Sequence, residues 1–209
     1  MDKKYELLKD DCINYEGRTL YRIKALRDFG YIKKGKLGGY IQSENNLSHE
    51  GECWVYGNAK VYEDARVFGN AKVFMNARVY GNAKVFGEAE VYDNAEVYGN
   101  SKIFENAEVY VNAVINKGRI IGRVSMPYKD IFQYQCENRV LTAILTEDDE
   151  ILYSIGCQEN ITEEEFIYRI HNKDGGLKEN PHRAEYLKLI KIIKLYLQIE
   201  ENVKIQECE

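Results

Sequence analysis

The sequence predicts a mainly β protein: a left-handed parallel β-helix, with a β cap before it and a small α+β domain after it. Two observations carry this prediction. A six-residue repeat fills the middle third of the chain, and the residue pattern changes on both sides of it. The predicted domains are an N-terminal β cap at residues 1–54, the β-helix at 55–126, and a C-terminal α+β domain at 127–209 that ends in a long helix.

Residues 1–54 precede the repeat and are expected to fold as its cap. Residues 18–26 alternate between apolar and polar side chains, as in a strand. Lys34-Gly35 and Gly38-Gly39 are predicted to form turns before Tyr40-Ile41. A cap is expected because the open end of a solenoid would expose strand edges and core.

The repeat begins at Val55 with VYGNAK, VYEDAR and VFGNAK, and twelve hexads reach residue 126. Three hexads per coil give four turns of a triangular solenoid. The β-branched first position, from Val55 to Ile121, is predicted to point inward. So is the alanine two residues before it, because side chains two apart share a strand face. Gly-Asn and Asp-Asn pairs are predicted to form the corners, since Gly and Asn tolerate left-handed backbone angles.

The outward positions fall on three faces when every eighteenth residue is read. The first face carries tyrosines beside charges of both signs, and the second carries mixed aromatic residues. The tyrosines of the first face, a candidate protein interface, are Tyr62, Tyr80 and Tyr98. The third face differs because its aromatic residues are all phenylalanine and its charges are all basic. Its candidate ligand-binding residues are Arg66, Lys84, Lys102, Phe68, Phe86 and Phe104.

Two interpretations of the third face stay open. An exposed sheet is not expected to carry a phenylalanine ladder, so another subunit or the C-terminal region would cover it. We expect a homotrimer, because β-helices of this class usually associate by threes. Alternatively, the face binds a ligand, whose bases stack on the rings and whose phosphates contact Arg66, Lys84 and Lys102. Both interpretations hold together if the ligand sits at the rim of a subunit interface.

The C-terminal domain is expected to contain strands followed by helices. Thr162 and Glu165 form a capping box that begins one helix, and Asn180-Pro181 begins the last one. The strands are predicted at Val140–Leu145 and Ile151–Ile155, with a weaker third at Ile131–Tyr134. The apolar face of the last helix comprises Tyr186, Leu189, Ile190, Ile193 and Leu197.

Composition limits the class of protein. The net charge of −5, from 29 Lys and Arg against 34 Asp and Glu, argues against a general nucleic-acid binder. Five scattered cysteines without a CxxC pair indicate reduced thiols rather than a metal or redox motif. No apolar signal core or membrane-spanning stretch is found. We expect a cytoplasmic protein without a cofactor or a bound metal.

Catalysis is not indicated by the sequence. Many proteins with this β-helix transfer acetyl groups from coenzyme A, and those enzymes usually need a histidine near the coil edge. The repeats contain no histidine. His49 lies in the cap, His171 at a helix end and His182 in the first turn of the last helix, and each is expected to be structural. Cys157 is a candidate nucleophile, but a buried structural cysteine is more common. No catalytic residue is predicted.

Several segments resemble the hexapeptide-repeat proteins carried by phages and prophages, some of which are labelled acyltransferases on their fold alone. The N-terminal matches are residues 20–30, 36–41, 46–48 and 53–59. The C-terminal matches are Asn138-Arg139, residues 141–143, Gly156-Cys157, Glu165-Phe166, His171 and residues 185–187. The chain departs from this group at Gln158, where phenylalanine is expected, and at Asp149-Glu150, where Asp-Gly is expected.

The resemblance covers most of residues 18–197 and implies the fold, but it is silent on activity. We therefore expect a non-enzymatic, phage-type binding or inhibitor protein. Its target would be a nucleotide signal or a host defence protein. The alternatives are a hexapeptide-repeat acyltransferase that uses acetyl-coenzyme A, and a structural or assembly module.

Overall fold

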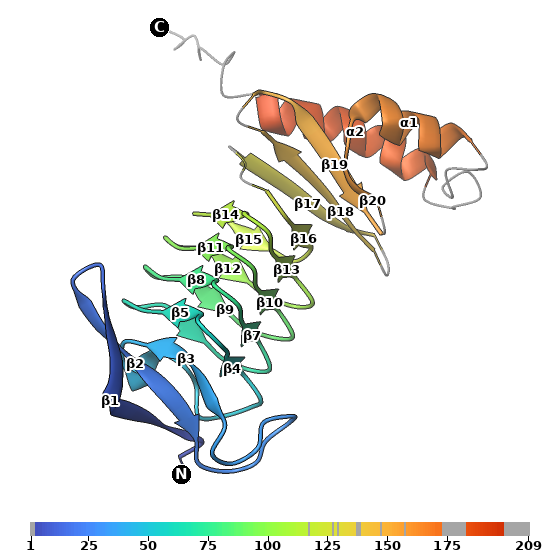
Figure 1. Cartoon of the computed structure of the whole chain (residues 1–209). Helices are drawn as coiled ribbons and strands as arrows, with labels where there is room; N and C mark the ends of the chain where they lie inside the picture. The colour runs from blue at the N-terminus through green and yellow to red at the C-terminus, as the bar shows by residue number, and fades with distance from the viewer. Residues whose placement is uncertain are drawn as a thin grey trace, which may run out of the picture. The chain divides into compact units, whose positions relative to one another are not determined.

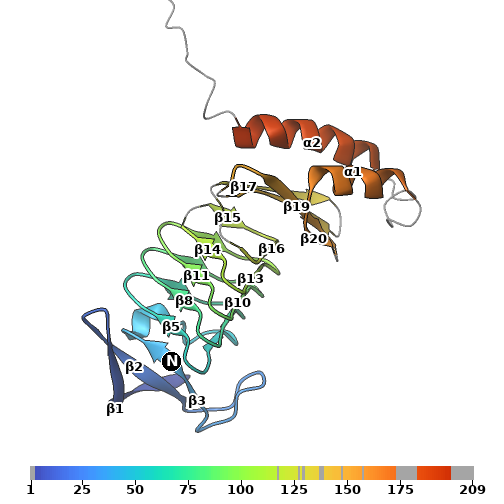
Figure 2. The same ribbon diagram turned by 45° about the horizontal axis from the view of Figure 1, so that its top comes forward.

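The computed structural model describes residues 3–116, 118–126, 128, 130–136, 139–146, 148–156, 158–172 and 183–198. The chain divides into two compact units, Met1–Pro127 and Tyr128–Glu209, and each is described by itself. Figures 1 and 2 show the short strands of the first unit stacked coil upon coil. The first unit is thus a parallel β-helix, as predicted.

Three parallel stacks form the β-helix. The first contains β3 (Leu37–Ile41), β5 (Lys60–Val61), β8 (Arg78–Val79), β11 (Glu96–Val97) and β14 (Val114–Ile115). The second contains β4 (Trp54–Val55), β7 (Lys72–Val73), β10 (Glu90–Val91), β13 (Glu108–Val109) and β16 (Arg123–Val124). The third contains β6 (Arg66–Val67), β9 (Lys84–Val85), β12 (Lys102–Ile103) and β15 (Arg119–Ile120).

The interior of the coils is built as the repeat predicts. The β-branched residues from Val55 to Ile115 and the alanines that precede them are at most 1 % exposed. The large residue fills the triangular interior and the small one leaves room for it. Ser101 replaces one alanine, and its hydroxyl lies 2.6 Å from the carbonyl oxygen of Tyr98, so its polar group is satisfied.

The last coil corrects the prediction for Ile121. Ile120 and Val124 point inward, and Ile121 is partly exposed. Ile120 pairs with Ile103, which is seventeen residues earlier rather than eighteen. Gly118, at a φ of 92°, lies in this shortened corner. The left-handed backbone that glycine allows closes the corner one residue sooner.

The stacking begins before residue 55. β3 pairs in parallel with β5, and Leu47 forms a parallel bridge with Val67. Gly38-Gly39 lies inside β3 and does not form the predicted turn. Only glycine fits at these two positions, because the neighbouring backbone is too close for a side chain. A Cβ at Gly38 would lie 2.5 Å from the carbonyl oxygen of Val55, and a Cβ at Gly39 would lie 2.6 Å from the carbonyl oxygen of Ala59.

The corners use left-handed backbone, as the Gly-Asn and Asp-Asn pairs predict. Glycine occupies many of these positions, and Glu63, Asp93 and Glu105 occupy others with φ between 55° and 58°. Met75 and Val111 are the unusual cases, at φ of 59° and 57°, and both are exposed. A β-branched residue is rarely found in this conformation because its side chain crowds the backbone.

Replacing Val111 by asparagine is expected to raise the free energy of unfolding by about 1 kcal/mol, because asparagine tolerates the left-handed backbone and valine does not. Urea denaturation measures the change. Val114→Asn is the matched control, since Val114 lies in a strand and is partly exposed, and it should give no gain. A lower stability for Val111→Asn than for the wild type would contradict the assignment of strain to this corner.

An antiparallel hairpin extends the sheet of the first stack, because its second strand pairs with β3, and it also packs on part of that stack. It consists of β1 (Tyr5–Tyr15) and β2 (Arg18–Ala25), joined by Glu16-Gly17, where both residues have positive φ as in a tight hairpin turn. The alternation in residues 18–26 predicted β2, but β1 was not predicted. Leu20 and Tyr40 pack on Tyr62 together with Ile13 and Tyr15.

The hairpin's first residues close the N-terminal end of the β-helix. Within the stacks, backbone N–H groups donate to carbonyls of the following coil, as Trp54 does to Ala71 at 3.1 Å. The first carbonyls of the second and third stacks have no preceding coil. Lys4 Nζ donates to the carbonyl oxygen of Cys53 at 2.9 Å, and the Tyr5 hydroxyl donates to that of Leu47 at 2.7 Å. Burial lowers the pKa of the Lys4 ammonium.

The second unit is an antiparallel sheet packed against two helices. Its sheet order is β17 (Asp130–Cys136), β18 (Arg139–Leu145), β19 (Ile151–Ile155) and β20 (Gln158–Ile161). The helices are α1 (Glu163–His171) and α2 (Arg183–Gln198). The three predicted strands are confirmed, and β20 is an addition that was not predicted. Asn180-Pro181, the predicted start of the last helix, lies outside the described residues.

Both helices are built as their sequence patterns predict. Thr162 caps α1, since its hydroxyl accepts from the Glu165 backbone N–H at 3.2 Å. The predicted apolar face of α2, from Tyr186 to Leu197, is buried against the sheet and α1.

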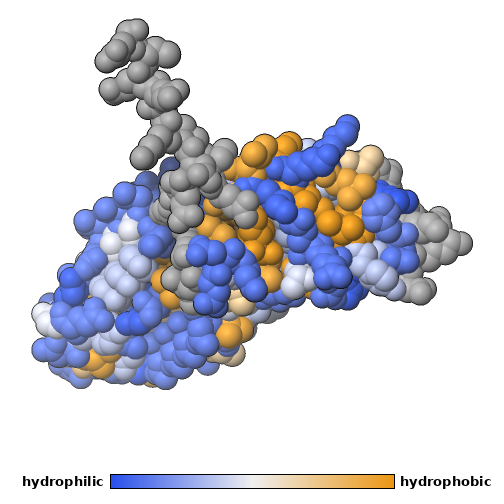
Figure 3. Space-filling view, turned by 90° about the horizontal axis from the view of Figure 1, so that it is seen from above, coloured by the Kyte–Doolittle hydropathy of each residue, from blue (hydrophilic) through white to orange (hydrophobic). Residues whose placement is uncertain are grey.

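On the other side of α2, three residues are more than half exposed, and Figure 3 shows apolar residues at the surface. These are Ile192, Leu195 and Tyr196. Neither described helix is long and apolar enough to cross a membrane.

Candidate ligand-binding face

Most of the described cations on the first two stacks pair with carboxylates of neighbouring coils; Lys60 is the exception, and its Nζ donates to the carbonyl oxygen of Asn58 at 3.1 Å. On the second stack, Lys72 Nζ lies 2.7 Å from Glu90 Oε1, and Arg123 lies 3.1 Å from Glu108. On the first stack, Arg78 pairs with Glu96 of the next coil. Opposite charges directly across neighbouring strands stabilise a sheet, so these side chains have a structural role.

The third stack carries a column of cations instead. Arg66, Lys84, Lys102 and Arg119 lie in register on neighbouring strands, and all four are exposed. Within the described ranges, none of the four pairs with a carboxylate, in contrast to Lys72, Arg78 and Arg123 of the other stacks. Neighbouring strands are about 4.8 Å apart, so these like charges repel one another. We call these four residues the cationic column.

A column of phenylalanines runs beside the cations. Phe68 and Phe86 stack with ring centroids 4.8 Å apart, and Phe86 and Phe104 with centroids 5.2 Å apart. The Arg119 guanidinium lies 4.8 Å from the centroid of the Phe104 ring. We call the two columns together the cationic face. The structure thus brings all six predicted ligand-binding residues together and adds Arg119, but Phe104 is buried, with only 9 % of its surface exposed, which corrects its assignment as an accessible residue.

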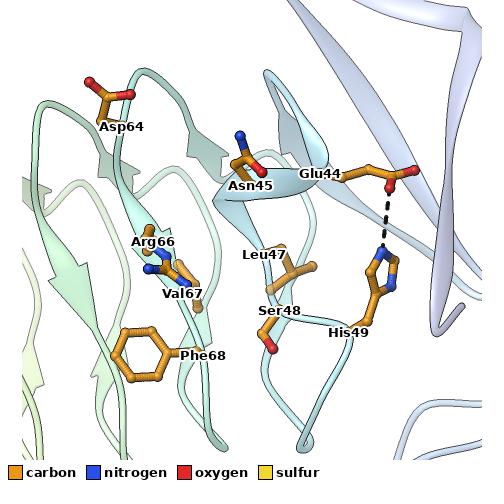
Figure 4. A pocket seen from close by; sticks show the side chains of 9 residues that line it. All are labelled: Glu44, Asn45, Leu47, Ser48, His49, Asp64, Arg66, Val67 and Phe68. Atoms are coloured by element: carbon orange, nitrogen blue, oxygen red, sulfur yellow. Dashed lines mark ion pairs between the residues drawn. The ribbon is translucent and has the colours of Figure 1, made fainter. Parts of the chain in front are cut away.

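A pocket of about 520 Å³ opens at the N-terminal end of this face. Arg66 and Phe68 line it on one side, and Glu44 and His49 on the other, with Ser48 between them (Figure 4). Leu47, Val67, Asn45 and Asp64 complete its lining. The pocket therefore combines apolar surface with negatively and positively charged side chains. It is continuous with the cationic face through Arg66 and Phe68.

The pocket's histidine is held from three sides. His49 Nδ1 accepts the Lys4 backbone N–H at 3.2 Å, and its ring stacks on Tyr5 with centroids 4.3 Å apart. Its Nε2 lies 3.7 Å from Glu44 Oε2. A hydrogen bond from Lys3 holds the pKa of Glu44 below its usual value. These contacts fix the orientation of His49 and leave Nε2 as the nitrogen that carries the proton.

The tyrosine column of the first stack is less accessible than its outward positions suggest. Tyr62, Tyr80 and Tyr98 stack with centroids 4.9–5.0 Å apart. Tyr62 is only 1 % exposed because the hairpin covers it, which corrects its assignment as an exposed interface residue. Tyr80 and Tyr98 are partly exposed. Burial, with a contribution from Glu96, raises the pKa of Tyr80 to about 12.

The other candidate residues belong to the second unit. His171 ends α1 in the second unit, where its Nδ1 lies 2.6 Å from Arg183 Nη2. His182 and Cys157 lie outside the described residues. In the part of the chain that the structure describes, no three His, Cys, Asp or Glu side chains are grouped to hold a metal ion.

Two parts of the site were not predicted. Arg119 was missed because the last coil is one residue short, which places it seventeen positions after Lys102. Ser48 and His49 were assigned to the cap, although Leu47 stands six residues after Ile41 and continues the hexad spacing. The six-residue spacing from Ile41 to Leu47 was the signal that could have placed Ser48 and His49 in the first coil. No protein-family model matches the chain, and no curated protein matches it either.

Proposed function

We propose that this protein is a non-enzymatic binding protein that captures a phosphorylated, nucleotide-like ligand on its cationic face. The observation that carries the proposal is the cationic column. Four exposed cations lie in register without carboxylate partners among the described residues, whereas Lys72, Arg78 and Arg123 of the other two stacks are paired with carboxylates of neighbouring coils. A row of phosphates would relieve their mutual repulsion and accept charge-assisted hydrogen bonds.

The chain's overall charge supports a local ligand rather than long nucleic acid. The net charge is −5, so the cationic column is a small basic region on an acidic protein. A long polyanion would meet repulsion outside the column. The phenylalanine column adds aromatic surface to the same face, which favours a ligand that combines phosphates with a planar ring.

Charge reversal at Lys84 tests the proposal. Lys84→Glu is expected to weaken binding of inorganic tripolyphosphate by at least about tenfold, because each lost charged contact costs about 1.5–3 kcal/mol. Calorimetric titration at low salt measures the dissociation constant. Lys72→Glu is the matched control: it makes the same charge change on the second stack, where Lys72 pairs with Glu90.

The two variants separate the proposal from a general charge effect. Unchanged folding by circular dichroism is required of both. Equal affinities for Lys84→Glu and Lys72→Glu would contradict a ligand site on the cationic face, as would a wild-type protein that binds no oligophosphate.

The resemblance to phage-borne proteins supports a biological role for such capture. A phage accessory protein that sequesters a host nucleotide signal would need tight, selective binding and no turnover. Capture of a host defence protein is the related alternative, in which the partly exposed Tyr80 and Tyr98 would contribute to the interface.

Acyl transfer is the second candidate, because His49 lines the pocket. To act as a general base His49 would have to release the Lys4 backbone N–H that its Nδ1 accepts, because its Nε2 carries the proton. In that case acetyl-coenzyme A binds, and His49→Ala removes acetyl transfer without removing that binding. Acetyl transfer by the purified protein would place this candidate above capture.

The trimer predicted from the sequence stays a prediction, and sedimentation of the full chain tests it. A trimer is expected to have three times the chain mass of 24.3 kDa. A clean monomer at that mass would contradict the trimer but leave capture by a single chain intact.

A further inference from the structure

We propose that the pocket at the N-terminal end of the cationic face binds the planar ring of a nucleotide, stacked on Phe68, while the phosphates lie on the cationic column. This inference rests on the proposed function and specifies where the ligand's ring binds. It identifies the ligand class as a nucleoside with attached phosphates rather than an inorganic oligophosphate.

The first argument is the position of Ser48 in the coil. The Ser48 backbone N–H donates to the Val67 carbonyl at 2.9 Å, as that of Phe68 does to Val85 at 3.1 Å one coil later. Ser48 therefore holds the place that phenylalanine holds in the next three coils. A serine is much smaller than a phenylalanine, and the pocket opens at this point in the column.

The second argument is the geometry of the phenylalanine stack. Phe68 has a ring neighbour on the side of Phe86, at an interplanar angle of 3°. On the side of Ser48, no aromatic ring stacks on Phe68 among the described residues. At the opposite end the Arg119 guanidinium lies 4.8 Å from the Phe104 centroid, and Phe104 is buried. At the Phe68 end the Arg66 guanidinium lies farther away, 5.9 Å from the ring centroid, and Phe68 is partly exposed and lines the pocket. A planar ring of a ligand would therefore extend the stack at Phe68, inside the pocket.

The third argument is the distribution of charge around the pocket. Arg66 lies beside Phe68, and Lys84 follows it in register on the next strand, so phosphates attached to the ring reach two cations at once. The two carboxylates of the pocket are placed away from that path. Glu44 is held by Lys3 at 2.7 Å, and Asp64 lies at the edge opposite Phe68 (Figure 4).

A polar group suited to a base edge completes the pocket. The side chains of His49 and Asn45 line the pocket on the side away from Phe68 (Figure 4). His49 Nε2 is shielded from solvent beside Glu44, so the histidine contributes its ring to the wall rather than a free polar atom. The exposed amide of Asn45 is the polar group that the edge of a base would meet.

The decisive variant is Ser48→Phe, which fills the pocket with the ring that the column lacks. Titrations use the four common ribonucleoside triphosphates and inorganic tripolyphosphate as probes. For the wild type, at least one nucleoside triphosphate is expected to bind about tenfold or more tightly than tripolyphosphate, the advantage expected for one stacked base. Ser48→Phe should abolish that advantage and leave tripolyphosphate binding unchanged. Ser48→Ala, which keeps the pocket open, should retain the advantage.

The outcomes separate this inference from the proposed function. If nucleoside triphosphates and tripolyphosphate bind the wild type equally, or if Ser48→Phe keeps the advantage, the ring site is wrong and anion capture stands. If no probe binds, the proposed function itself is wrong. Should Ser48→Phe fail to fold, Phe68→Ala decides, because it removes the stacking partner and should remove the same advantage.

Discussion

Replacing Lys4 by alanine is expected to lower the free energy of unfolding by at least about 3 kcal/mol, since the loss leaves several buried polar groups without a donor. Lys4 is fully buried. Its Nζ donates to the carbonyl oxygens of Cys53 and Gly51 at 2.9 and 3.3 Å, and it lies 3.2 Å from Cys53 Sγ. It also lies 5.0 Å from the centroid of the Phe29 ring.

Urea denaturation of two further variants isolates the cause. Lys4→Met keeps most of the packing but no donor, so it should lose about 1–3 kcal/mol from the unpaired carbonyls. Lys3→Ala changes an exposed neighbour and should lose less than about 0.5 kcal/mol. Equal denaturation midpoints for Lys4→Ala and Lys3→Ala would show that Lys4 does not close the end of the β-helix.

Replacing Ala83 by leucine is expected to lower the free energy of unfolding by about 1–3 kcal/mol, because the added methylenes overpack the interior. Ala83 is fully buried, and it shares the interior of its coil with Val85, which is equally buried. The coils above and below repeat the same arrangement, so the backbone has little freedom to move aside.

Lys84→Ala is the control for this prediction. Lys84 follows Ala83 directly but points outward and is exposed, so its loss should cost less than about 0.5 kcal/mol. Thermal melts compare the two variants. A melting temperature for Ala83→Leu equal to that of the wild type would mean that Ala83 does not point into the core.

The solenoid was predictable because each hexad contains the information for its own conformation. A β-branched residue such as Val85 forms the strand, a small residue such as Ala83 leaves room in the interior, and a glycine such as Gly87 forms the corner. All three lie within one six-residue repeat. The cationic column was also predictable as far as the period holds. Arg66, Lys84 and Lys102 are spaced by eighteen, and Arg119 breaks that spacing by one residue.

The ends of the β-helix were not predictable in the same way. Leu47 and Val55 are eight residues apart, so the first coil departs from the repeat and was assigned to the cap. The pairing of Lys4 with the Cys53 carbonyl joins residues 49 positions apart, and no local pattern marks it. A lysine near the N-terminus is usually exposed, so only the unpaired carbonyls at the end of the solenoid explain its burial.

Native mass spectrometry of freshly purified full-length protein tests most directly whether the cationic face captures a phosphorylated ligand. The wild type is expected to retain a small phosphorus-containing molecule, and a variant with Lys84→Glu and Lys102→Glu is expected to be free of it while keeping its fold. A wild type with no bound mass, or a double variant that retains the same molecule, would contradict the account.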